Sequence, residues 1–163
     1  MIRDAVERVY SVVNSNFATQ LATLLTAASL PALTPMVFKR RSAERFYAHT
    51  ACGVGVYHEG GTTSRRKPGA ASGSGIRDSR PILVLDFYLR GTTEADVEQQ
   101  TEVAIQALLR SVDAIPTTGV FSAGDGPGSV TWEIISTPLS EDRTMAESRA
   151  LIRFPVVVRE TGL

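Results

Sequence analysis

One stretch of the sequence, residues 81–112, constrains the fold more than any other, because a strand pattern passes directly into a helix pattern. Residues 82–89 divide in alternation between two faces, which is typical of a β-strand. One face holds Leu83, Leu85, Phe87 and Leu89. Gly91 ends the alternation, and Thr93 offers an N-cap for the segment that follows. Apolar residues there recur at spacings of three and four, so we predict a helix that ends before Pro116.

The rest of the chain completes an α+β pattern. An amphipathic helix is predicted before Pro31, because apolar residues recur at helical spacing along this segment. Further strands are predicted at residues 36–40, 49–57, 130–134 and 150–159. The last of them contains Pro155, which cannot donate a ladder hydrogen bond and therefore favours an edge or bulged position. We predict a single domain over residues 1–163, with two helices on one face of a mainly antiparallel sheet of about four to five strands.

Residues 58–80 separate two of these strands and are predicted to form a long basic loop. They are rich in glycine and serine, and Arg65, Arg66 and Lys67 follow one another within them. Loops longer than about 12–15 residues are usually functional or disordered. The net charge of the chain is zero, but residues 39–80 hold nine basic and three acidic residues, against eight and fourteen elsewhere. This separation of charge makes the loop the best candidate contact surface.

Three environments are compatible with the cations of this loop. They could contact nucleic-acid phosphates, the acidic surfaces of a neighbouring copy, or solvent alone. No aromatic residue lies between Tyr57 and Phe87, which argues against stacking on single-stranded bases. We therefore favour contact between subunits and place DNA contact second. The candidate contact residues are Arg65, Arg66, Lys67, Arg77 and Arg80.

The sequence offers few groups for catalysis or metal binding. Its one cysteine, Cys52, excludes an internal disulfide, and its two histidines are His49 and His58. A catalytic Cys–His pair competes with an inert buried thiol, which we favour because Cys52 lies among small strand residues. The spacing of these three residues matches no standard zinc pattern. Asp86 and Glu133 each allow two interpretations, a buried acid or an outward-facing residue, and we favour the second.

The glycine-rich segments carry no nucleotide-binding motif. Residues 124–128 lack the Lys-Ser/Thr ending of a P-loop, and residues 69–75 do not lead from a strand into a helix with the spacing of a dinucleotide site. No apolar run approaches about 18 residues, the length of a membrane span. We therefore expect no enzyme activity, no metal, no cofactor and no membrane partner.

The organisation of the chain resembles that of the tail-terminator (tail-completion) proteins of long-tailed bacteriophages. The resemblance rests on the N-terminal helix, on the glycine-rich insertion leading into RPILVLDFYLRGTTEADVEQQTEVAIQALL, and on the last strand, SRALIRFPVVVRE. It implies a small α/β domain that assembles in the host cytoplasm as a hexameric ring. Such a ring caps the tail tube of the virion, joins it to the head, and contacts tail-tube and connector proteins. The basic residues would then lie at a ring or subunit interface, or towards the lumen through which DNA passes.

Three hypotheses about function follow from these observations. The first is a tail-terminator ring subunit, or a related neck or connector subunit of the same virions. The second is a nucleic-acid-binding module that uses the basic loop. The third is a small hydrolase or transferase that uses Cys52 or Asp86.

Overall fold

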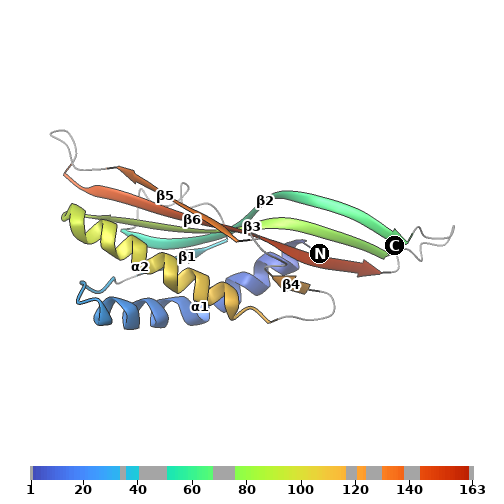
Figure 1. Ribbon diagram of the computed structural model, residues 1–163, viewed down its shortest axis with the longest axis horizontal. Helices are drawn as coiled ribbons and strands as arrows, with labels where there is room; N and C mark the ends of the chain where they lie inside the picture. The colour runs from blue at the N-terminus through green and yellow to red at the C-terminus, as the bar shows by residue number, and fades with distance from the viewer. Residues whose placement is uncertain are drawn as a thin grey trace.

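The computed structural model of the chain describes residues 2–33, 36–40, 51–67, 76–116, 121–123, 130–137 and 144–161. Two helices, α1 (Ile2–Ala27) and α2 (Glu94–Asp113), lie on one face of a six-stranded sheet (Figure 1). The strands are β1 (Val37–Lys39), β2 (Cys52–Lys67), β3 (Ile76–Gly91), β4 (Phe121–Ala123), β5 (Thr131–Thr137) and β6 (Ala146–Thr161).

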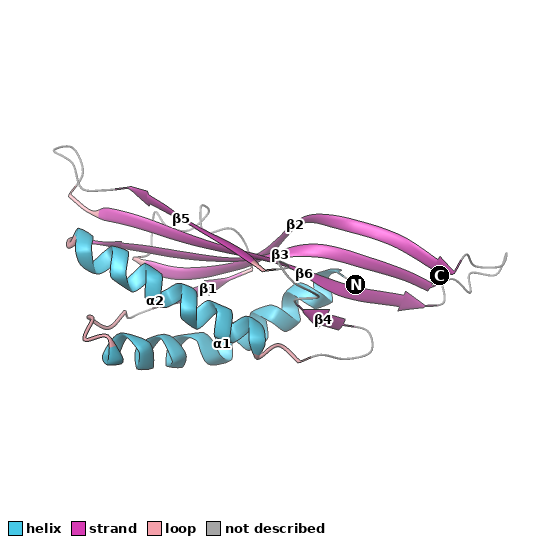
Figure 2. Ribbon diagram, viewed as in Figure 1, coloured by secondary structure: helices cyan, strands magenta, loops and turns pink. Residues whose placement is uncertain are grey.

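The sheet is built around two long antiparallel strands, β3 and β6. The strand order is β1-β2-β3-β6-β4, and β5 also pairs with β6. Of the strand pairs that the structure describes, β1–β2 is parallel and the others are antiparallel. The predicted α+β class, with two helices on one face of a mainly antiparallel sheet, is confirmed (Figure 2). The strand β4 lies where no strand is predicted.

The core lies between the helices and the sheet. One stripe of α1 is buried, and it contacts the sheet through Phe17, whose ring packs in T-shaped geometry with Phe38 and Phe87 at centroid distances of 6.4 and 6.0 Å. The predicted inward face of β3 is confirmed as buried, and so is the corresponding face of β6. These residues are Leu83, Leu85, Phe87 and Leu89 in β3 and Ile152, Phe154, Val156 and Val158 in β6. In the described part of the chain, neither helix is both long and apolar enough to cross a membrane.

The predicted long loop at residues 58–80 is wrong for most of its length. The strand β2 continues to Lys67 and β3 begins at Ile76, while residues 68–75 lie outside the described part of the chain. Glycine and serine favour a loop when only local composition is considered. Here pairing with β3 supplies the hydrogen bonds of an extended ladder, and tertiary pairing overrides such local preferences.

The distal halves of β2, β3 and β6 form an arm that reaches beyond the two helices (Figure 1). We define this arm as residues 59–67, 76–82 and 155–161. Its three strands pair with one another out to Lys67, Ile76 and Thr161. The basic segment is therefore a projecting part of the sheet itself.

A seam of irregular pairing separates the arm from the body of the sheet. On β2, Gly60 and Gly61 have φ angles of 135° and 154°, and the register shifts beside them. Such angles favour glycine because it has no side chain. Gly61 pairs with Pro81 of β3, which has no N–H to donate. A Cβ on Gly61 would overlap the carbonyl oxygen of Arg80, so the two strands approach closely here.

Pro155 continues the seam into β6; of the two predicted positions, edge or bulge, the edge position is wrong. The strand β6 is central, with β3 on one side and both β5 and β4 on the other. Pairing with β5 runs up to Arg153, and pairing with β4 begins at Val156. Pro155 thus occupies the point at which β6 changes partner, where a missing donor does least damage to the ladder.

Candidate functional site

The arm brings the predicted basic residues together on neighbouring strands. Arg65 of β2 is in register with Arg77 of β3, and Lys67 is in register with Ile76 near the end of the arm. Over its whole length the arm contains six cations and three carboxylates. Like charges directly opposite each other are destabilising, so the arm concentrates positive charge that an acidic partner would relieve.

Two of these cations have no carboxylate partner among the described residues. The side chain of Arg80 is exposed and that of Arg77 is partly buried, and neither makes a salt bridge there. By contrast, Arg159 lies 3.0 Å from the buried carboxylate of Asp78, so this cation is neutralised within the arm. Among the described side chains, the positive charge of Arg77 and Arg80 is therefore not offset by an ion pair.

A second surface, missed by the sequence predictions, is the edge strand β5. It exposes Trp132, Ile134 and Ile135, which are 55%, 37% and 48% accessible. Trp132 and Ile135 lie on opposite faces, because they are in register with Ile152 and Arg149 of β6 respectively. In the described part of the sheet, β5 pairs on one side alone. An edge strand with exposed apolar side chains is a template for pairing with another chain.

Cys52 and His58 do not form a catalytic pair, in agreement with the favoured interpretation of Cys52 as an inert buried thiol. Cys52 is buried, and burial raises the pKa of its thiol to about 12, so the reactive thiolate is essentially absent at neutral pH. His58 is exposed and lies six residues further along β2, about 20 Å away at the rise of an extended strand. His49 lies outside the described residues. Within the described residues, Cys52 therefore lacks the exposure and the lowered pKa that a nucleophilic thiol needs.

Asp86 is buried, so the favoured interpretation of an outward-facing residue is wrong. Its side chain is 0% exposed and binds Arg149 in a bidentate pair, with both N–O distances at 2.7 Å. Gly55 of β2 is in register with Asp86 and contributes no side chain of its own beside the pair. A buried carboxylate held in this way has a structural explanation and does not require a catalytic one.

Glu133 is half-exposed, as predicted, and belongs to a charge network. Arg153 of β6 donates to Glu133 of β5 at 2.6 Å and to Glu59 of β2 at 2.9 Å. These two hydrogen bonds raise the pKa of the Arg153 guanidinium. The network thus links β6 to both β5 and β2, and because its side chains are exposed it adds little stability.

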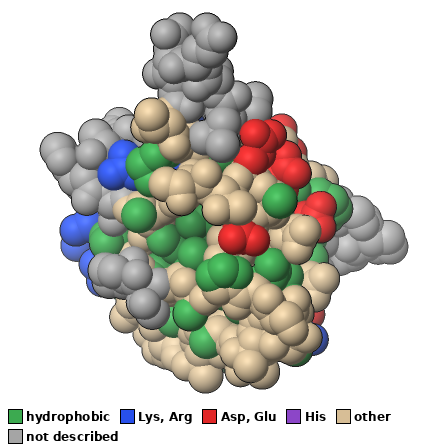
Figure 3. Space-filling model, turned by 90° about the vertical axis from the view of Figure 1, so that its left-hand side faces the viewer, with side chains coloured by type: hydrophobic (Ala, Val, Ile, Leu, Met, Phe, Trp, Pro, Cys, Tyr) green, Lys and Arg blue, Asp and Glu red, His purple; other side chains and the backbone are tan. Residues whose placement is uncertain are grey.

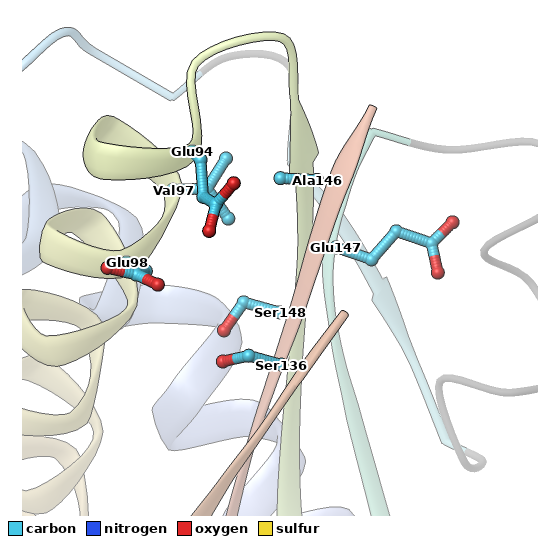
Figure 4. Close-up of a pocket in the computed structure, with 7 residues that line it drawn as sticks. All are labelled: Glu94, Val97, Glu98, Ser136, Ala146, Glu147 and Ser148. Carbon is cyan, nitrogen blue, oxygen red and sulfur yellow. The ribbon is translucent and has the colours of Figure 1, made fainter. Parts of the chain in front are cut away.

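A small pocket lies where α2 begins and β6 starts (Figure 4). Its volume is about 10 Å³, room for roughly one water molecule. The carboxylates of Glu94 and Glu98 and the hydroxyls of Ser136 and Ser148 lie around it, whereas the side chain of Glu147 points away (Figure 4). Ser148 is 1% exposed, and its Oγ has no hydrogen-bond partner among the residues that the structure describes. The strand alternation does not reveal this pocket, because it forms only where α2 packs beside β5 and β6.

Comparison with known proteins leaves these surfaces as the main guide to function. No protein-family model matches the chain, and no curated protein matches it. Among the described residues there is no group of three or more His, Cys, Asp or Glu side chains that could hold a metal ion. The glycine-rich residues 69–75 and 124–128 lie outside the described part of the chain.

Proposed function

We propose that the chain is a structural subunit that assembles into a ring at the neck or tail of a long-tailed bacteriophage. Such a ring would terminate the tail tube and join it to the head. The observation that carries this proposal is the arm, which extends past the helices and exposes Arg80, Ile82 and residues 60–63. A projecting ribbon of sheet with exposed main chain and unpaired cations suits contact with a neighbouring subunit.

The two edges of the sheet support a head-to-tail arrangement of subunits. One edge is β5, and the other is the distal part of β2, since β1 pairs with β2 from Gly53 to Gly55 alone. These edges differ in sequence and in charge, so a contact between them joins unlike surfaces. Heterologous contacts of this kind produce rings when the rotation between subunits closes. The two helices against a sheet also agree with the outline that the tail-terminator resemblance implies.

The state of assembly can be tested on the purified chain by native mass spectrometry and light scattering. We expect a discrete oligomer that negative-stain microscopy resolves as a ring. Trp132→Thr and Ile135→Lys should shift it towards the monomer without unfolding it, because both side chains are largely exposed. Ile2→Thr is the matched control, since Ile2 is a comparably exposed apolar residue on α1. A chain that stays monomeric at high concentration and does not associate with tail tubes would refute the proposal.

A second candidate function is contact with DNA through the arm. The register of Arg65 with Arg77 favours it, because a cation-bearing β-ribbon can follow a phosphate backbone. The variant Arg77→Ala/Arg80→Ala should then weaken DNA binding and reduce the slope of log affinity against log salt by about one per cation. No measurable binding to duplex or single strands at low salt would remove this candidate.

A further inference from the structure

The edge of β5 lacks the features that keep other sheet edges from pairing. Natural edge strands are protected when they are short, when they carry lysine or proline, or when a bulge interrupts them. The strand β5 contains no lysine, proline or glycine, and its register with β6 is regular along its whole length. Its one charged residue, Glu133, is already bound by Arg153. Trp132 and Ile135 expose apolar side chains on opposite faces, so β5 is suited to pairing with another strand.

The strands β5 and β4 together form one long edge, which we call the composite edge. Both lie on the side of β6 that faces away from β3, β5 beside residues 147–153 and β4 beside residues 156–158. They run in the same direction, because each is antiparallel to β6. In the described part of the sheet, the composite edge therefore extends along residues 147–158 of β6 with no further strand beside it. At its β5 end it lies next to the start of α2, where acidic side chains gather on the surface (Figure 3).

A second copy of the chain offers an open edge of nearly the same length. The strand β1 pairs with β2 from Gly53 to Gly55, so in the described part of the sheet β2 is open on that side from Val56 to Lys67. Residues 58–63 of this stretch are exposed. The strand β1 also forms an edge, but it has three residues and ends at a lysine. Length therefore matches the composite edge to β2 of another copy better than to β1 or to a second β5.

The strand order determines the direction of such a contact. The strand β2 is antiparallel to β3, β3 to β6, and β6 to β5, so β2 and β5 of one copy run in opposite directions. In a ring whose copies continue one sheet, rotation from one copy to the next does not reverse the strands. The strand β5 of one copy therefore meets β2 of its neighbour in antiparallel orientation, which is the more stable kind of pairing.

The register within one copy determines the displacement between copies. Tyr57 of β2 is level with Thr131 at the beginning of β5, through Val84 of β3 and Arg153 of β6. For β2 of the neighbour to lie along β5, its Tyr57 has to be level with Thr137, which displaces the neighbour by about six residues, or about 20 Å. Across the strands β2, β3, β6 and β5, a width of about 19 Å, this displacement is a strand tilt of about 45°. Closed β-barrels have tilts of about 35–45°, so the contact is compatible with a closed ring.

We propose that the composite edge of β5 and β4 binds the open edge of β2 from a second copy of the chain, so that one sheet continues from subunit to subunit. Residues 131–137 pair antiparallel with residues 57–63 of the neighbour, and the rest of its β2 continues beside β4. Main-chain hydrogen bonds supply most of the affinity of such a contact. The contact rests on the proposed assembly into a ring and specifies how one subunit recognises the next. It is heterologous, because the two edges belong to different strands.

A cysteine scan tests the pairing of the two edges directly. Copies that carry Ile135→Cys are mixed with copies that carry one new cysteine at each of residues 57–63 in turn, then assembled and oxidised. We expect disulfide-linked dimers at alternate positions of β2, because side chains of a strand alternate between faces and directly opposed residues lie within disulfide reach. Gln106→Cys, on the exposed side of α2, is the matched control and should give no link. A ring without links, or one in which Ile135→Cys copies link only to each other, would overturn the contact while leaving the assembly intact.

Proline substitution provides a second readout, which depends on the main chain alone. The N–H groups of Ile134 and Ile135 point to opposite sides of β5, so one donates towards β6 and the other towards the open edge. Proline at the outward-pointing position should leave the chain folded and weaken subunit association by roughly tenfold or more. Alanine at the same position is the control, because it removes the same side chain and keeps the N–H. Equal association of the folded proline and alanine variants would contradict the contact, and a wild-type chain that never assembles would refute both the contact and the proposed function.

Discussion

Replacing Arg149 with methionine would leave the Asp86 carboxylate buried without the cation that it binds. The carboxylate is 0% exposed and the arginine side chain is 15% exposed, so the acid cannot reach solvent while the guanidinium partly can. Breaking a buried pair from the cationic side costs about 3–5 kcal/mol of unfolding free energy. Asp86→Leu should cost less, because the long arginine side chain can move its charged head into water.

The double variant Asp86→Leu/Arg149→Met completes a thermodynamic cycle. Well-packed apolar replacements of a buried ion pair are often neutral, so the double variant should be within about 1 kcal/mol of the wild type. Urea unfolding followed by far-ultraviolet circular dichroism, at one fixed protein concentration, measures all four chains. If Arg149→Met costs less than about 1 kcal/mol, or if the double variant loses the sum of the single losses, the pair is not the buried unit described above.

Three further outcomes follow from local geometry. Phe17→Ala should lower the unfolding free energy by about 3–5 kcal/mol, because it leaves a cavity where a fully buried ring lies between the helix and the sheet. Phe17→Leu should lower the unfolding free energy clearly less in the same urea assay. Cys52 should resist a thiol-reactive dye at pH 8 until denaturant is added, since the pKa of its thiol is about 12; fast labelling of the folded chain would contradict its burial. Gly61→Ala should lower the unfolding free energy by at least about 1 kcal/mol more than Gly60→Ala does. The reason is that a Cβ at Gly60 meets open space, whereas one at Gly61 meets the next strand. Equal losses of unfolding free energy would show that only the φ angles matter.

Periodicity predicted the helices and the inward face of the sheet because these depend on contacts that recur at fixed spacing. The alternation around Phe87 and the helical stripe around Phe17 each reflect one buried side, and the structure confirms both. Composition predicted the arm wrongly as a loop, because pairing with a distant strand decides whether residues 58–67 are extended.

The candidate contact surfaces were only partly predictable. The run of cations indicated a contact segment, but its placement at the end of a strand depends on the register between β2 and β3. The adjacent pair Ile134-Ile135 did carry a signal, since neighbouring strand residues point to opposite faces and one of them has to face away from the core. The unsatisfied hydroxyl of Ser148 had no sequence signal, because it results from the packing of three elements that are distant in the chain.

The seam has a mechanical consequence for any closed ring. Three adjacent strands lose regular hydrogen bonding at one level, at Gly61, Pro81 and Pro155, so the sheet bends most easily along that line. In the proposed ring, the angle between body and arm would set how far each subunit turns relative to the next. The curvature of the ring, and with it the number of subunits, would then be set within each protomer by two prolines and a glycine. A substitution that stiffened this line would change the diameter of the ring while leaving every contact between subunits unaltered.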